Sequence, residues 1–157
     1  MEFGVATADQ IASLSGLEML QTMMAGKLPA PTIGKTLGFR LVEAEKGRAV
    51  FEGTPGPHVL NPLGQVHGGF ALTLIDSAAG CAVHSELGAG VGYTTVETKV
   101  NFTRPIDPAG GPIRCEGRVL SRGRTIATAE AFLRSREGKL LAHGTSTLII
   151  LSGRPDK

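Results

Sequence analysis

The stretch "HVLNPLGQVHGGFALTLIDSAAGCAVHS", residues 58–85, decides how this chain folds. It opens with turn residues and a His-Gly-Gly triplet, then continues from Gly68 to His84 without a single Lys, Arg or Glu. A helix that is apolar or small on every side is buried rather than laid on a surface. We therefore expect a central buried helix over these residues, carrying one lone acid, Asp76.

The sequence offers Asp76 no partner of opposite charge within this helix. A helical partner would sit three or four residues away, and those positions hold Leu72, Thr73, Ala79 and Gly80. Because a carboxylate is rarely buried without a partner, the pattern favours a functional acid. The alternative is a structural acid at a solvated edge, or one that accepts hydrogen bonds from a neighbouring strand.

The start of the helix suggests a second functional group. The first N–H groups of a helix have no internal acceptors, and glycines at Gly68 and Gly69 leave them open to a ligand oxygen, such as the oxyanion formed when a carbonyl is attacked. Capping by a loop residue is the alternative. Gly68 and Asp76 are roughly 12 Å apart along a helix, too far to reach one carbonyl carbon. If they act together, the two helices must come from two chains.

The rest of the chain predicts an α+β domain. Apolar residues at helical spacing over residues 9–25 indicate a short N-terminal helix, and residues 37–54 alternate around Lys46-Gly47 as a hairpin does. Four strand-like runs follow the central helix, and we expect them to form an antiparallel meander. The predicted units are an N-terminal helix and linker (1–32), the main domain (33–151) and a C-terminal tail (152–157).

Composition narrows the classes of function. A chain of 157 residues with a formal net charge of +2, one Tyr and no Trp lacks the basic patch and stacking aromatics of a nucleic-acid interface. Cys81 and Cys115 have no metal-ligand spacing and predict buried thiols in a reducing compartment. The N-terminal residues show neither a secretory signal nor a membrane span, so the expected location is the cytoplasm, with no membrane partner.

The motif "NPLGQVHGG" (61–69), followed by "LIDSAAGCA" (74–82), resembles the PaaI-type acyl-CoA thioesterases of the hotdog fold. The resemblance covers about residues 33–151. It implies an antiparallel sheet wrapped around a long central helix, here with an extra N-terminal helix. It also implies that two protomers join their sheets into a dimer, and that dimers commonly pair into tetramers.

The resemblance also implies roles for individual residues. Asn61 and the Gly68 N–H of one subunit would hold the thioester, and Asp76 of the other subunit would activate water or attack directly. Thr95 would position the water, with Thr94 as the alternative if the strand register slips by one residue.

Further residues would play supporting parts. His67 would support the loop and the helix start rather than transfer protons, and Gly69 would add a backbone contact to the substrate. The resemblance implies no metal and no redox cofactor, since coenzyme A is part of the substrate.

Coenzyme A carries phosphates, and the sequence offers two candidate anion sites. Arg122 and Arg124, with Gly123 between them in a tight turn, form a plausible phosphate clamp. A solvated hairpin tip is the alternative reading of this turn. Arg104, before Pro105, is a further candidate.

We therefore expect an acyl-CoA thioesterase acting on aromatic groups such as phenylacetyl, or on medium-chain acyl groups. A non-catalytic acyl-CoA binding or sensor module on the same fold is the alternative. The sequence shows no signature of the hydratase branch. Met19, Met23 and Met24 would either pack in the core or cover the acyl pocket.

Overall fold

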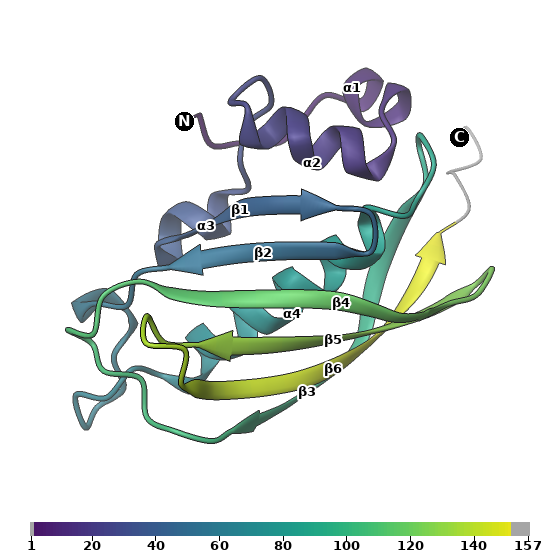
Figure 1. The fold of residues 1–157 in the computed structure, drawn as a ribbon. Helices are drawn as coiled ribbons and strands as arrows, with labels where there is room; N and C mark the ends of the chain where they lie inside the picture. Colours follow the sequence, from purple (N-terminus) through teal and green to yellow (C-terminus); the bar gives the residue numbers. More distant parts are fainter. Residues whose placement is uncertain (1, 152–157) are drawn as a thin grey trace.

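In the computed structural model, which describes residues 2–151, a six-stranded antiparallel sheet curves around one long helix (Figure 1). The helix is α4, and the strands lie in the order β1-β2-β4-β5-β6-β3. This is the predicted α+β arrangement. The elements are α1 (Ala8–Ser13), α2 (Gly16–Met24), α3 (Thr32–Leu37), β1 (Phe39–Glu45), β2 (Arg48–Gly53), a 3-10 turn (Pro57–Val59), α4 (Gly68–His84), β3 (Gly92–Phe102), β4 (Ile113–Arg122), β5 (Ile126–Arg134) and β6 (Leu140–Leu151).

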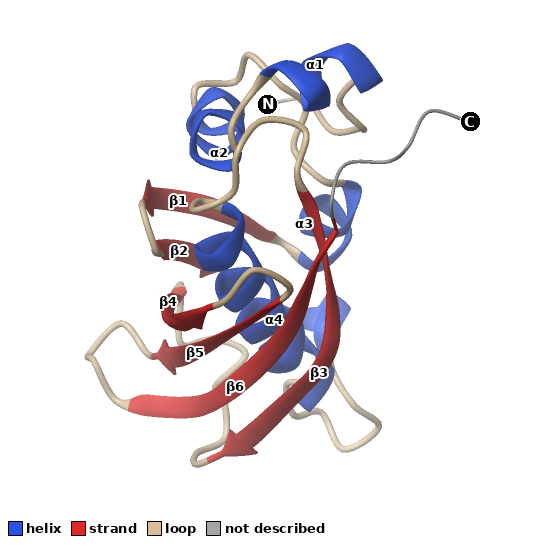
Figure 2. Cartoon of the chain, turned by 90° about the vertical axis from the view of Figure 1, so that its right-hand side faces the viewer, coloured by secondary structure: helices blue, strands red, loops and turns tan. Residues whose placement is uncertain are grey.

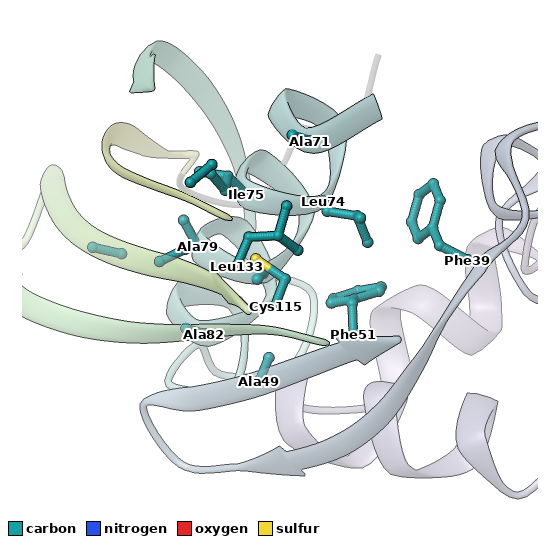
Figure 3. Packing of buried hydrophobic residues seen from close by; sticks show 14 of the residues in the cluster. Phe39, Ala49, Phe51, Ala71, Leu74, Ile75, Ala79, Ala82, Cys115 and Leu133 are labelled. Carbon is teal, nitrogen blue, oxygen red and sulfur yellow. The ribbon is translucent and has the colours of Figure 1, made fainter. Parts of the chain in front are cut away.

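Helix α4 spans the predicted residues and is largely buried, as its composition requires. Its small side chains allow it to lie close to the sheet, packing mainly on β4, β5 and β2 (Figure 3). At Gly117 of β4 an added Cβ would overlap the carbonyl of Ala78, so only glycine fits there. The core cluster includes Phe39, Phe51, Ala71, Leu74, Ile75, Ala79, Ala82, Cys115 and Leu133.

The predicted hairpin is present, but the predicted meander is wrong in part. β1 and β2 pair across the turn at Gly47, which adopts a positive φ of 75°. After α4, however, β3 pairs with β6 rather than with β4, and β4 lies beside β2. Only β4, β5 and β6 form a meander. Alternation of apolar and polar residues identifies a strand, but it does not identify the partner of that strand.

The N-terminal segment contains more helices than the sequence predicted. The expected helix over residues 9–25 is two helices, because Ser15 starts α2 with a capping box to Glu18. The predicted linker also contains the start of α3, which ends at Gly38 in the left-handed conformation, with a φ of 74°.

Helix α2 docks on the end of α4 through the main chain. The Gly16 N–H donates to the carbonyl oxygen of Leu87 at 3.0 Å, and an added Cβ at Gly16 would overlap the His84 carbonyl. Figure 2 shows α1 and α2 beyond the β1 edge of the sheet, and α2 packs against β1 and α4. None of the helices in residues 2–151 is long and apolar enough to cross a membrane. The predicted tail over residues 152–157 lies outside the described residues.

Candidate active site

The loop before α4 presents an amide side chain. A bridge between Leu60 and Val66 closes the loop. Within it, Asn61 Oδ1 accepts hydrogen bonds from the backbone N–H groups of Leu63 (2.9 Å) and Gln65 (3.1 Å). Because the oxygen is used by the loop, the amide nitrogen of Asn61 remains available to donate to a substrate oxygen.

His67 caps the helix. Its Nδ1 accepts a hydrogen bond from the Gly69 N–H at 2.8 Å, so this nitrogen is unprotonated and the Gly69 N–H already has a partner. Within residues 2–151 the Gly68 N–H has no acceptor. Of the two glycines predicted to contact the substrate, Gly68 therefore offers the free backbone donor, and His67 supports the helix start as expected.

A surface pocket of about 370 Å³ adjoins Gly68. The ring of Phe102 lies over this glycine, 3.1 Å from the position of an added Cβ. Arg104 is at the same pocket, and its Nη1 donates to the carbonyl oxygen of Leu140 at 3.0 Å. The structure thus brings the Gly68 backbone and the Arg104 cation to one pocket, whose wall is partly apolar.

Asp76 faces β3, where two hydroxyl groups meet its carboxylate. Thr95 Oγ1 donates to Asp76 Oδ1 at 3.0 Å, and Thr98 Oγ1 donates to the same oxygen at 3.1 Å. Thr94 is exposed and makes no such contact, so Thr95 is the threonine in the predicted register. No described residue donates a hydrogen bond to Asp76 Oδ2.

The sequence analysis missed Thr98 and Ser146. Ser146, on β6, lies directly opposite Thr98 in the β3–β6 pair, and their hydroxyl oxygens are 2.9 Å apart. A β-bulge between Thr95 and Glu97 puts residues three apart on one face of the strand, which strict alternation does not allow. Only the three-dimensional pairing reveals this hydroxyl network.

The arginines of the predicted clamp lie away from the Gly68 pocket. Arg122, Gly123 and Arg124 form the exposed turn between β4 and β5, where Gly123 N–H donates to the Ile126 carbonyl oxygen at 2.8 Å. Strand pairing places this turn at the opposite end of the sheet from Arg104. Within one chain, the two candidate phosphate sites are therefore separate.

A second pocket, of about 400 Å³, lies beyond Asp76 toward the C-terminal end of α4. Cys81 and Tyr93 line its inner wall, and Met19 and Met23 of α2 line its outer wall. Burial, as the main cause, raises the pKa of the Cys81 thiol to about 12, so this thiol is protonated and is no nucleophile at neutral pH. Of the three methionines for which the sequence left core packing and pocket lining open, Met19 and Met23 line this pocket, and Met24 does not.

The continuity of α4 bears on how the site is assembled. Gly68 and Asp76 lie on one unbroken helix, so about 12 Å separates them along its axis. One chain therefore cannot present both groups to a single carbonyl carbon. In residues 2–151, no cluster of three or more His, Cys, Asp or Glu side chains is placed to hold a metal ion.

Comparison with known proteins gives one matching family and several individual relatives. The sequence profile of the thioesterase superfamily matches residues 63–142. Human acyl-coenzyme A thioesterase 13 is 29% identical over 133 residues, covering 83% of this chain and 90% of that protein. A proposed esterase of Saccharolobus solfataricus is 33% identical over 122 residues, covering 78% of this chain and 85% of that protein.

Solved structures agree with the fold. A phenylacetic acid degradation-related protein of Ralstonia eutropha JMP134 is 29% identical, with a TM-score of 0.75 over 83% of this chain and 98% of that chain. The PaaI protein of E. coli, at 22% identity, has a TM-score of 0.75 over 90% of this chain and 98% of that chain. This chain belongs to the thioesterase superfamily and is a thioester hydrolase with a PaaI-type hotdog fold.

Proposed function

We propose that the enzyme hydrolyses acyl-CoA thioesters at sites shared between two chains. The observation that carries this proposal is the Asp76 carboxylate, which two threonine hydroxyls anchor through Oδ1 while Oδ2 has no donor among the described residues. A carboxylate held in this way can accept a proton from water.

The proposed reaction begins when Asp76 Oδ2 removes a proton from a water molecule, whose oxygen attacks the thioester carbonyl carbon. The carbonyl electron pair moves onto oxygen, and the Gly68 N–H and the Asn61 amide of the other chain stabilise the resulting oxyanion. When the tetrahedral intermediate collapses, the C–S bond breaks. The thiolate leaves and takes the proton from Asp76, giving a carboxylic acid and free CoA.

The edge strand β3 supports the two-chain arrangement. β3 ends the sheet, and its outer edge has no partner strand in the described chain. Large apolar side chains are exposed here, Val96 at 57% and Phe102 at 59%. Pairing of β3 with its symmetry mate would cover this edge and bring two copies of α4 together. We propose that two such dimers form a tetramer.

The two pockets suggest how the substrate lies. The apolar pocket under α2 begins one to two helical turns after Asp76, so it suits the acyl group, either aromatic or medium-chain. The Gly68 pocket suits the thioester and the start of the pantetheine arm. Arg104 of the same chain, or the Arg122-Gly123-Arg124 turn of another, would bind the CoA phosphates. The free thiols fit a reducing compartment, and we place the enzyme in the cytoplasm.

The test is thiol release from a panel of aromatic, medium-chain and long-chain acyl-CoAs. Asp76→Asn keeps the size of the side chain and removes the base, so we expect kcat to fall by at least about 100-fold. Asp9→Asn, at an exposed position in the first turn of α1, is the matched control and should behave as wild type.

Near-normal turnover in Asp76→Asn would contradict the mechanism. Binding of acyl-CoA without turnover by the wild type would instead favour the binding-module alternative. The best substrate of the panel assigns the acyl class.

A further inference from the structure

The bulge in β3 gives Asp76 two anchors instead of one. In a regular strand, Thr95 and Thr98 would face opposite sides of the sheet. The register shift between Thr95 and Glu97 inserts Val96 as an extra residue, and both hydroxyls then face α4. The bulge is therefore the local structure that concentrates hydroxyl groups on the catalytic carboxylate.

Proton counting fixes the direction of these hydrogen bonds. A carboxylate accepts and does not donate, so Thr95 and Thr98 each direct their single hydroxyl proton at Asp76 Oδ1. Thr98 then has only lone pairs to offer to any other partner. The second polar side chain in contact with Thr98 must therefore donate its own proton to the Thr98 oxygen.

Ser146 is that second partner. Its hydroxyl lies 2.9 Å from Thr98 Oγ1 and 3.1 Å from the Glu97 carbonyl oxygen, and the residue is only 1% exposed. Its one proton is shared between an oxygen that anchors Asp76 and the backbone of the bulge. Because Ser146 is buried behind Thr98, it cannot touch the substrate, and any effect on catalysis must pass through β3.

We propose that Ser146 is a positioning residue: through Thr98 it fixes Asp76 Oδ1, so that Oδ2 is the oxygen that deprotonates water. This inference rests on the proposed function, in which Asp76 activates water. Thr95 is the second anchor and holds the same oxygen without contact to Ser146. Losing one anchor frees the carboxylate to rotate, which lowers the fraction of time that Oδ2 is aligned with the water.

The experiment is a double-mutant cycle on the intact enzyme. Ser146→Ala is expected to lower kcat about 5- to 10-fold, the size of one lost hydrogen bond, with KM changed by less than about 2-fold. In a Thr98→Val background the same substitution should change kcat by less than about 2-fold, because its route to Asp76 is already cut. In a Thr95→Val background its full effect should persist.

Two further variants separate positioning from general damage to the sheet. Thr98→Ser retains the hydroxyl and should keep kcat within about 3-fold of wild type, whereas Thr98→Val should lose about 10-fold. Thr147→Val is the matched control, because the Thr147 hydroxyl contacts the Glu97 carboxylate instead and should leave kcat unchanged. If Ser146→Ala does not fold, as thermal unfolding would show, Ser146→Cys replaces it in the cycle, because the thiol has a similar size but is a weak donor.

Specific outcomes overturn the inference. Three outcomes would show that Ser146 does not act through Thr98. The loss of kcat from Ser146→Ala could be the same in the wild type and in the Thr98→Val background. Ser146→Ala could instead change KM rather than kcat, or have no effect. If Asp76→Asn remains active, the proposed function itself fails. If Asp76→Asn is inactive but the effects of Ser146→Ala and Thr98→Val on kcat are independent, only this inference fails.

Discussion

At the scale of single residues, burial controls the chemistry of the cysteines. It raises the pKa of the Cys81 thiol to about 12 and raises that of Cys115 as well. Since the thiolate is the reactive form, we expect a thiol-reactive dye to label the native protein hardly at all at pH 8, and to label two thiols after denaturation. Cys81 is half-buried, so rapid labelling of one thiol in the native state would show that this thiol ionises despite its apolar surroundings, and would contradict the expectation.

The sequence predicted part of the candidate site, and the reason is physical. Asp76 and Gly68 stand out because a charge and an open helix start are unusual in a buried helix. Thr95 was expected from the resemblance to the PaaI-type thioesterases, with Thr94 left as the alternative because the register could slip by one residue. Thr98 could not be found in this way, because the bulge changes which residues of β3 face α4. Ser146 comes from β6, far along the chain, and only folding brings it to Thr98.

At the scale of elements, the docking of α2 on α4 depends on the absence of a side chain at Gly16. An added Cβ at Gly16 would overlap the His84 carbonyl, so Gly16→Ala should move α2 away from the end of α4. We expect a loss of about 1–3 kcal/mol in the free energy of unfolding and faster proteolysis between α1 and β1. Gly88→Ala is the matched control, because an added Cβ there meets nothing within 4 Å. Equal stability of the two variants would contradict the packing described.

His84 makes the same end of α4 sensitive to acid. Its ring packs against Tyr93, with ring centroids 5.5 Å apart, and its Nδ1 is buried without a hydrogen-bond partner in the described residues. Burial lowers the pKa of His84 below its ordinary value. The unfolded chain therefore binds a proton below about pH 6.5 more readily than the folded chain does, and stability falls as the pH drops.

The measurement is denaturant unfolding between pH 7 and pH 5 for the wild type and for His84→Phe. The wild type should lose more free energy of unfolding over this range than the variant, which has no group to protonate at this position. Parallel pH dependences would rule out a contribution from His84.

The elements themselves differed in how far the sequence predicted them. The central helix and the first hairpin follow from local patterns and were predicted within a few residues. The break at Ser15 was missed, because apolar spacing continues across it while the capping box restarts the helix. The pairing of β3 with β6 was also missed, because the choice of a partner strand depends on contacts distant in sequence.

At the scale of the whole molecule, the two-chain site can be tested by mixing two inactive enzymes. Asp76→Asn removes the base from one copy, and Gly68→Val places a side chain against Phe102 at the other half-site. In a mixed dimer, the unaltered Gly68 of one chain faces the unaltered Asp76 of the other. After denaturation and refolding of an equal mixture, we expect about a quarter of wild-type activity, since half of the dimers carry one intact site.

Each variant refolded alone is the control and should remain inactive. If the mixture is also inactive while mass measurement shows mixed dimers, the site lies within one chain. An enzyme that is active as a monomer would lead to the same conclusion.

The pairing of β3 with β6 also determines when the protein can fold during synthesis. Roughly 40 residues separate the end of β3 from its partner, so at about 5–20 residues per second the ribosome leaves β3 without that partner for a few seconds. During this interval the edge of β3 that later pairs with β6 is open to other nascent chains. Because Ser146 is in the last strand, the hydroxyl anchors of Asp76 are completed only when the end of the sheet emerges. The hydroxyl network around Asp76 therefore forms only after β6 has paired with β3.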